Sequence, residues 1–192
     1  MLDQSDQSLT RPVREPVDSP RAVSRRDFLA RLAGLVPAIA LADATAPRAL
    51  SLVHTYTSER LRVEYFSGGR YLPDALASVN HFLRDFRTGE VHAIEPGLLD
   101  LLHRLAGAAG TNRPFQVISG YRSPATNASL RQRSEGVAAG SLHMKGQAID
   151  IRPTDVPLAT LRACAVDLRG GGVGYYPSSN FVHVDVGRVR TW

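Results

Sequence analysis

Residues 141–152 read SLHMKGQAIDIR, and polar and apolar side chains alternate over the second half of this segment. Alternation with a period of two is typical of a β-strand that has one buried face. Such a strand directs its two isoleucines into the core and places Asp150 on the opposite face. Gly146 allows the chain to turn between His143 and this strand. The segment therefore predicts that the His143 imidazole lies just before a strand and that the Asp150 carboxylate lies on the polar face of that strand.

A second alternating segment covers residues 181–186 and reads FVHVDV. Its valines share one face, and His183 and Asp185 share the other. If the two strands are neighbours in a sheet, His183 faces Asp150. Two imidazoles and one carboxylate are a common protein ligand set for catalytic Zn²⁺, which keeps one position open for water. The pattern indicates a site for one Zn²⁺ per chain, formed by His143, Asp150 and His183.

The remaining metal-binding side chains do not form a competing pattern. Cys164 is the sole cysteine, so a zinc site here uses nitrogen and oxygen ligands. The other histidines lie in a predicted hairpin or on and between predicted helices, without a matching carboxylate strand, and we expect structural or surface roles for them. They are His54, His81, His92 and His103.

The other periodic segments alternate between short strands and helices. The expected strands are 50–54, 61–66, 115–119, 147–152, 172–176 and 181–186, and the first two read as a hairpin. The expected helices are 74–86, 97–109, 158–168 and one that begins at Ser123-Pro124 and ends near residue 134. This order predicts an α+β fold in which a small antiparallel sheet carries the site.

The first 46 residues have the pattern of an export signal. Arg25 and Arg26 precede an apolar stretch from Leu32 to Leu41, and small residues follow at alternate positions up to Ala46. A membrane span needs about 20 apolar residues, so this stretch is too short for one. We expect a twin-arginine signal over residues 1–46, a single domain over 47–192 without stable membrane insertion after signal removal, and a periplasmic location.

The formal net charge of +5 indicates an anionic partner. The arginines are scattered, however, and no basic run interleaves with aromatic residues, so nucleic acid is not the expected partner.

Several motifs resemble those of a known peptidase group. The pattern Ser141-x-His143-x-x-Gly146-x-Ala148-x-Asp150, followed by a late His183, is similar to the metal-binding signature of the D-Ala-D-Ala metallopeptidases. More narrowly, residues 119–124, 126–127, 171–176 and 181–185 resemble murein endopeptidase K and its relatives, and the likeness extends over about residues 50–192. It implies a zinc cofactor, peptidoglycan stem peptides as partners, and hydrolysis of the cross-links between them.

The resemblance also implies roles for residues around the metal. Ser141 belongs to the substrate-binding wall, and Arg122 takes the position of an arginine that stabilises the transition state. Three tyrosines either line the cleft as substrate-binding residues or pack in the core, and they are Tyr121, Tyr175 and Tyr176.

The general base is the open role in this pattern. Several members of the group carry a glutamate or histidine three residues before the last zinc-binding histidine, and this chain has Asn180 there, which cannot take a proton from water. Asp185 lies two residues beyond His183 on the same strand face. It is either the catalytic base or a residue that orients an imidazole.

The leading hypothesis is a zinc-dependent murein endopeptidase. A D,D-carboxypeptidase or dipeptidase acting on stem termini is the neighbouring alternative, and it requires a cleft with one end closed by a group that captures a carboxylate. A zinc-bearing module that binds the wall without turnover is the alternative from another class, and Asn180 at the expected base position favours it.

Overall fold

The computed structural model describes residues 44–134 and 136–192. The predicted export signal, residues 1–46, falls almost entirely outside these described residues. The predicted domain, residues 47–192, falls within them apart from residue 135. Within the described part of the chain, no helix combines the length and the apolar character that a membrane span requires.

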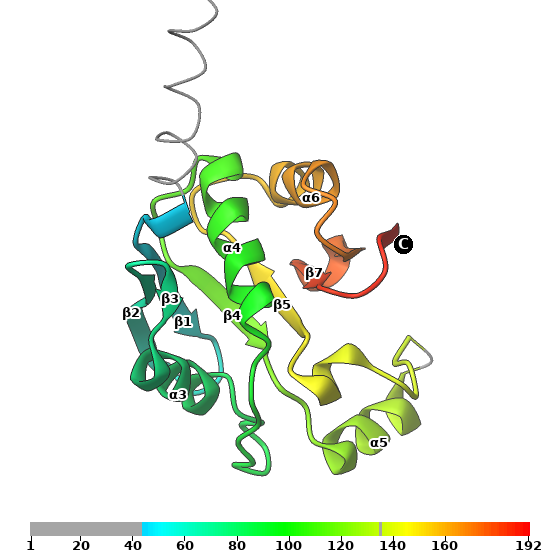
Figure 1. Ribbon diagram of the computed structural model, residues 1–192. Coiled ribbons are helices and arrows are strands. Elements are labelled where there is room, and N and C mark those ends of the chain that lie inside the picture. The colour runs from blue at the N-terminus through cyan, green and yellow to red at the C-terminus, as the bar shows by residue number, and fades with distance from the viewer. Residues whose placement is uncertain (1–43, 135) are drawn as a thin grey trace, which may run out of the picture. The chain divides into compact units, whose positions relative to one another are not determined.

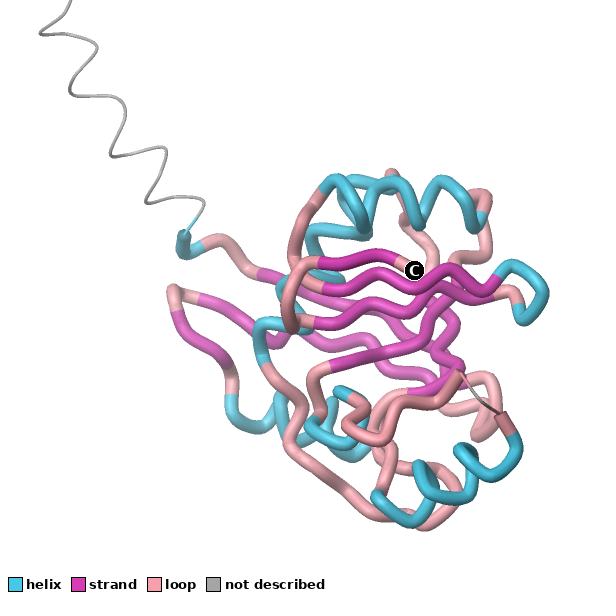
Figure 2. Tube along the Cα trace, turned by 90° about the vertical axis from the view of Figure 1, so that its right-hand side faces the viewer, coloured by secondary structure: helices cyan, strands magenta, loops and turns pink. Residues whose placement is uncertain are grey.

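The strands form one mixed sheet, drawn in magenta in Figure 2. Eight strands of the described residues take part, in the order β3-β2-β1-β4-β5-β7-β6-β8. They are β1 (Arg48–His54), β2 (Arg60–Ser67), β3 (Arg70–Tyr71), β4 (Phe115–Ser119), β5 (Ala148–Arg152), β6 (Gly172–Tyr176), β7 (Phe181–Asp185) and β8 (Arg190–Thr191). Strand β1 runs parallel to β4, and β6 runs parallel to β8, whereas all other neighbours are antiparallel. The predicted α+β fold and the hairpin of β1 and β2 are confirmed. The sheet is wider than expected, and its antiparallel part β4-β5-β7-β6 carries the site.

Helices accompany the sheet (Figure 1), and four of them lie within residues 48–192. They are α3 (Pro73–Phe82), α4 (Pro96–Ala109), α5 (Pro124–Arg133) and α6 (Leu158–Asp167), with short 3₁₀ turns η1 (Leu142–Lys145) and η2 (Pro177–Ser179). Helices α3, α4 and α5 each begin with a proline, whose φ suits the first helical turn.

The expectation that the first helix extends to residue 86 is wrong, because α3 ends at Phe82. The chain turns instead after Asp85. The Arg87 N–H donates to the Asp85 carboxylate at 3.0 Å, and the Gly89 N–H donates to the Asp85 carbonyl at 2.7 Å. Gly89 has a φ of +76°, a conformation that glycine adopts without steric cost.

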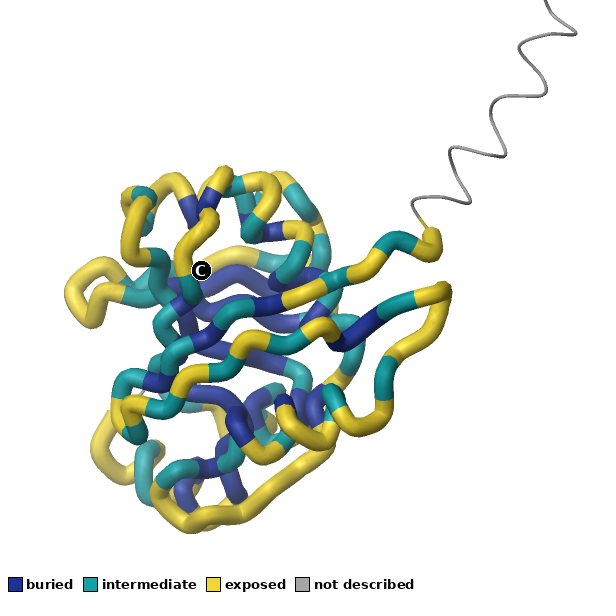
Figure 3. The backbone as a smooth tube through the Cα atoms, turned by 90° about the vertical axis from the view of Figure 1, so that its left-hand side faces the viewer, coloured by how far each residue is buried: buried dark blue, intermediate teal, exposed yellow. Residues whose placement is uncertain are grey.

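The hydrophobic core lies between the sheet and the helices α3, α4 and α6. Helix α4 packs on β1 and α6, and α6 packs on β6 and β7. Helix α4 contributes buried leucines at spacings of three and four, and β5 and β7 contribute the isoleucines and valines of their inner faces. Figure 3 shows the buried parts of the chain in dark blue, gathered in the interior of the domain. The inner faces of β5 and β7 are therefore occupied by the core. Their opposite faces are free to carry polar side chains.

Candidate metal centre

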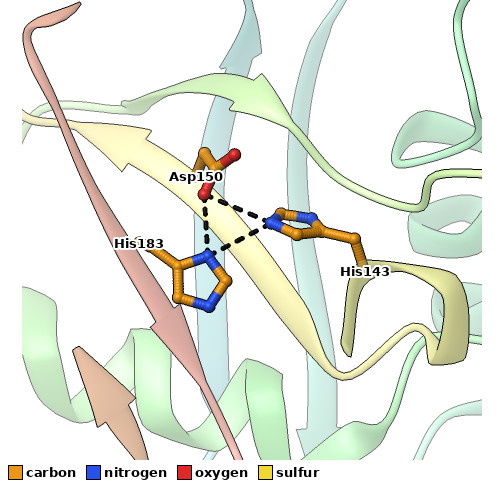
Figure 4. A group of neighbouring side chains, drawn as sticks. All are labelled: His143, Asp150 and His183. Atoms are coloured by element: carbon orange, nitrogen blue, oxygen red, sulfur yellow. Dashed lines mark hydrogen bonds and ion pairs between the residues drawn. The ribbon is translucent and has the colours of Figure 1, made fainter. Parts of the chain in front are cut away.

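His143, Asp150 and His183 converge from three segments of the chain (Figure 4). Asp150 on β5 lies directly opposite His183 on β7, and His143 comes from η1. Asp150 Oδ1 is 3.2 Å from His143 Nε2 and 2.9 Å from His183 Nδ1, and the two nitrogens are 3.2 Å apart. The structure thus brings the three sequence-predicted ligands together.

These three atoms suit a tetrahedral zinc site. Ligands at 2.0–2.1 Å from Zn²⁺ in tetrahedral geometry lie about 3.3 Å from one another. The observed separations of 2.9–3.2 Å are close to that value. All three residues are buried, and all three line one cavity, so a fourth position is accessible to a ligand from solvent. The donor set and its arrangement fit Zn²⁺ with an open position.

Hydrogen bonds on the far side of each imidazole determine which nitrogen faces the site. His143 Nδ1 lies 2.7 Å from the Gly120 carbonyl oxygen, and His183 Nε2 lies 3.2 Å from Asp185 Oδ2. Because a carbonyl and a carboxylate only accept, these two nitrogens carry protons. In the neutral rings the opposite nitrogens are then unprotonated and directed at the site, as metal ligation requires.

The electrostatics of the cluster favour an ionised carboxylate. Burial alone would raise the pKa of Asp150, but the charges and hydrogen bonds of His143 and His183 outweigh it and hold that pKa well below its usual range. Burial lowers the pKa of His143. For His183, burial acts in the same direction, but hydrogen bonds to Asp150 and Asp185 outweigh it and raise the pKa.

Asp185 lies behind His183 and has no exposed surface. Its carboxylate accepts the N–H groups of Gly172 at 2.9 Å and Gly187 at 2.8 Å, and the Arg190 guanidinium at 2.7 Å. Burial would raise the pKa of Asp185, but the hydrogen bonds of His183 and Arg190 outweigh it and lower that pKa. The structure places this carboxylate in contact with a ligand and away from the lining of the cavity.

Gly146 makes the turn between His143 and β5, as predicted from the sequence. Its φ is +65°, and a Cβ at this position would overlap the carbonyl group of Ala93. The Gly146 carbonyl in turn accepts the Glu95 N–H at 2.9 Å. The sharp turn and the close backbone approach both require glycine here.

Arg122 lines the cavity from the loop between β4 and α5. Its Nη2 donates to Asp150 Oδ2 at 3.1 Å and lies 3.3 Å from Ser119 Oγ. Burial lowers the pKa of the guanidinium. The Arg122 guanidinium therefore binds Asp150 Oδ2, whereas the two imidazoles face Asp150 Oδ1.

A buried carboxylate from the turn after α3 holds the Arg122 loop in place. Asp85 Oδ2 accepts the Ser123 N–H at 2.9 Å and the Ser123 hydroxyl at 2.6 Å. The Tyr121 N–H donates to the Leu83 carbonyl at 2.8 Å. This loop also supplies the Gly120 carbonyl that orients His143, so the turn at residues 83–90 supports two components of the site.

The three residues predicted for the substrate wall lie in different places. Ser141 lines the cavity. Tyr121 is buried elsewhere, where its hydroxyl donates to Glu90 at 2.6 Å and its ring stacks on His92 with centroids 4.7 Å apart. Tyr175 is half-buried beside the core, with Arg162 over its ring, and the structure does not bring it or Tyr121 to the cavity.

The cavity has a volume of about 470 Å³. Tyr176, a third tyrosine considered for the cleft, lies at its wall. The sequence analysis missed Phe181, Arg190 and Trp192, which also line the cavity. Gly174 on β6 is paired with His183 on β7. Because side chains alternate along a strand, Tyr176 lies on the same face of β6 as Gly174. Asn180, with a φ of +53°, ends η2 in the turn before β7.

Comparison with known proteins agrees with this geometry. The family model described as "Peptidoglycan L,D-endopeptidase MepK" matches residues 42–192. The chain is 49% identical over 156 residues to the peptidoglycan L,D-endopeptidase MepK of Escherichia coli K12, covering 81% of this chain and 86% of that protein. It is 43% identical over 155 residues to the Haemophilus influenzae protein named "Probable peptidoglycan L,D-endopeptidase MepK", covering 80% and 83%. The chain therefore belongs to the peptidoglycan L,D-endopeptidase MepK family.

Proposed function

We propose that this protein is a zinc-dependent endopeptidase that hydrolyses peptide cross-links between the stem peptides of peptidoglycan. The observation that carries the proposal is the convergence of His143, Asp150 and His183 on one face of the sheet, at the wall of a cavity. Membership of the MepK family supports the substrate class, since its relatives are named peptidoglycan L,D-endopeptidases.

The three side chains would hold one Zn²⁺. When bound, the ion supplies Lewis-acid chemistry, which lowers the pKa of a water and polarises a carbonyl group. The low pKa of Asp150 keeps its carboxylate ionised for this purpose at neutral pH. The hydrogen bonds of His143 to Gly120 and of His183 to Asp185 keep both imidazoles oriented before the ion arrives.

Arg122 is suited to stabilise negative charge that develops on the scissile carbonyl oxygen. Its guanidinium lies at the cavity wall and is buried. A cationic group in a site of low polarity interacts strongly with developing negative charge, because water does not screen it. We assign to Arg122 the role of transition-state donor.

Asp185 acts through His183 in this proposal. Its carboxylate is fully buried and accepts hydrogen bonds from the two glycine N–H groups and Arg190 as well as from His183. A general base needs to reach the attacking water directly or through one water. The placement of Asp185 behind the ligand supports the orienting role over the base.

A digest of isolated sacculi tests the proposed function. The purified protein with one equivalent of Zn²⁺ is incubated with sacculi, and the released muropeptides are separated and weighed. We expect conversion of cross-linked dimers into monomers, and no conversion by the His143→Ala variant. Release of terminal residues with intact cross-links would instead indicate a carboxypeptidase. Unchanged muropeptides with zinc bound would indicate a binding module.

We further propose that residues 1–46 direct export through the twin-arginine pathway to the periplasm. The paired Arg25 and Arg26 before a short apolar stretch support this, as does a substrate class that lies outside the cytoplasm. Replacing both arginines by lysine should retain the protein in the cytoplasm on cell fractionation. Unchanged periplasmic recovery would refute the route without affecting the assigned activity.

A further inference from the structure

The indole of Trp192 lies beside the metal ligands and remains 49% exposed. It lines the same cavity as His143, Asp150 and His183, and its ring centroid is 5.3 Å from that of His183. An aromatic side chain left in water forgoes much of the stabilisation that burial would provide. Packing of the core therefore does not account for an indole at this position.

The exposed indole is nevertheless held rigidly. Its Nε1–H donates to the Tyr176 hydroxyl at 2.7 Å, and the Arg190 guanidinium carbon lies 4.8 Å from the ring centroid. Both backbone polar groups of Trp192 form hydrogen bonds with β6. The Trp192 N–H donates to the Val173 carbonyl at 3.2 Å, and the Trp192 carbonyl accepts the Tyr175 N–H at 3.1 Å. A side chain that is already ordered loses little conformational entropy when a ligand packs on it.

A glycine in β6 provides the space that the Trp192 ring occupies. Gly174 is paired with His183 in the register of β6 and β7. A Cβ at Gly174 would approach the indole to within 2.8 Å, closer than such contacts allow. The ring thus lies directly over Gly174, next to the ligand strand, and a larger residue in β6 would displace it.

Two further rings extend this surface. Tyr176 stacks on Phe181 with centroids 4.6 Å apart and an interplanar angle of 20°. Together with Trp192 they form an aromatic wall, defined by these three residues, along the cavity that holds the metal ligands. Flat, rigid aromatic groups offer a large apolar contact area with few torsions to freeze, which suits the binding of peptide planes and aliphatic side chains.

We propose that Trp192 contacts the substrate and determines specificity: the aromatic wall packs against the peptide planes and aliphatic carbons of a cross-linked stem peptide. This inference rests on the proposed endopeptidase function. Arg122 contributes charge to the cavity, whereas the aromatic wall contributes apolar contact, so the two recognise different parts of one peptide.

Kinetics on purified cross-linked dimers test the proposal. For zinc-loaded Trp192→Leu we expect kcat/KM to fall at least tenfold, mainly through KM, with zinc content and melting temperature unchanged. Trp192→Phe should recover part of the loss. Tyr56→Ala serves as the matched control, because Tyr56 is another exposed aromatic residue, 61% accessible, that does not line the cavity. A kcat/KM for Trp192→Leu within twofold of wild type would overturn the proposal.

A second measurement needs no variant, because Trp192 is the sole tryptophan of the chain and all indole emission comes from the cavity. Metal-free protein, which cannot turn over, is titrated with the same dimers while binding is followed by calorimetry. A saturable change in emission that tracks the heat supports the contact. Binding heat with unchanged emission overturns it. Absence of both binding and turnover on murein would instead refute the proposed function, and with it this inference.

Discussion

The Asp185 carboxylate accepts a hydrogen bond from His183 Nε2, the ring nitrogen that faces away from the metal site, at 3.2 Å. It lies with no exposed surface in a pocket formed by backbone N–H groups and Arg190. A carboxylate in this position keeps the imidazole in one tautomer and one orientation. The contact supports the proposed orienting role of Asp185, which can be tested directly.

Asp185→Asn should weaken zinc binding by about 10–100-fold, the usual effect of losing the partner of a ligating histidine. Competition with a chromogenic chelator measures the affinity. Asp167→Asn is the control, since it makes the same change at the exposed end of α6. Wild-type zinc affinity combined with lost turnover would contradict the orienting role and identify Asp185 as the general base.

Gly146→Ala should abolish the site. The new side chain has to adopt a φ of +65° and to displace the Ala93 carbonyl, so the turn that carries His143 moves. Gly110→Ala is a matched comparison, because Gly110 has a φ of +67° and open space around it. In chemical unfolding we expect a loss of about 1 kcal/mol for Gly110→Ala and about 2 kcal/mol more for Gly146→Ala. Equal losses of unfolding free energy in the two variants would show that the overlap with the Ala93 carbonyl is relieved without an energetic cost.

Arg122→Lys should lower kcat about 10²–10³-fold, the range seen when one donor to a developing oxyanion is lost. Lysine keeps the charge but not the planar fork. Zinc content should be retained, as measured by atomic absorption. Arg48→Lys is the control, because Arg48 donates to Asp100 at 2.8 Å and neither residue lines the cavity, and it should leave turnover unchanged. If Arg122→Lys loses zinc, its main role is to hold Asp150.

Asp85→Ala should destabilise the protein by about 2–3 kcal/mol, because it leaves the Ser123 and Arg87 N–H groups without their charged acceptor. Urea unfolding measures this change, and the exposed Glu64→Ala is the control. Since the same carboxylate holds the Arg122 loop, kcat should fall as well. A stability loss without any change in kcat would show that the loop keeps its shape without Asp85.

Acid should destabilise the protein in part through His54, which is 1% exposed. Burial lowers the pKa of His54, and its Nδ1 accepts the Tyr56 and Thr57 N–H groups, so the folded state holds the neutral ring. Below pH of about 6.5 the unfolded chain binds a proton that the folded chain does not, and stability falls by up to about 1.4 kcal/mol per pH unit.

Unfolding of wild type and His54→Asn between pH 7.5 and 5 measures this contribution. Asparagine keeps an acceptor but does not titrate, so the variant should lose less stability than wild type as the pH falls. His81→Asn, at an exposed position of α3, should follow wild type. If the unfolding free energies of wild type and His54→Asn change with pH in parallel, His54 binds its proton equally in the folded and unfolded states.

The sequence alone determined the α+β class, the positions of most helices and strands, and the three residues expected to bind the metal. Each of these depends on local periodicity or on residue type. Alternation places Asp150 and His183 on polar faces of their strands whatever the rest of the chain does. Gly146 was readable as a turn because few other residues adopt its conformation.

Only the tertiary structure decided which side chains share the cavity. Tyr121 follows a strand end, yet Glu90 and His92 from a distant turn hold its ring away from the site. Trp192 reaches the site because β8 pairs in parallel with β6, a register that no local pattern specifies. Local periodicity determines on which face of a strand a residue lies. Pairing and packing between distant segments determine which other side chains lie against that face.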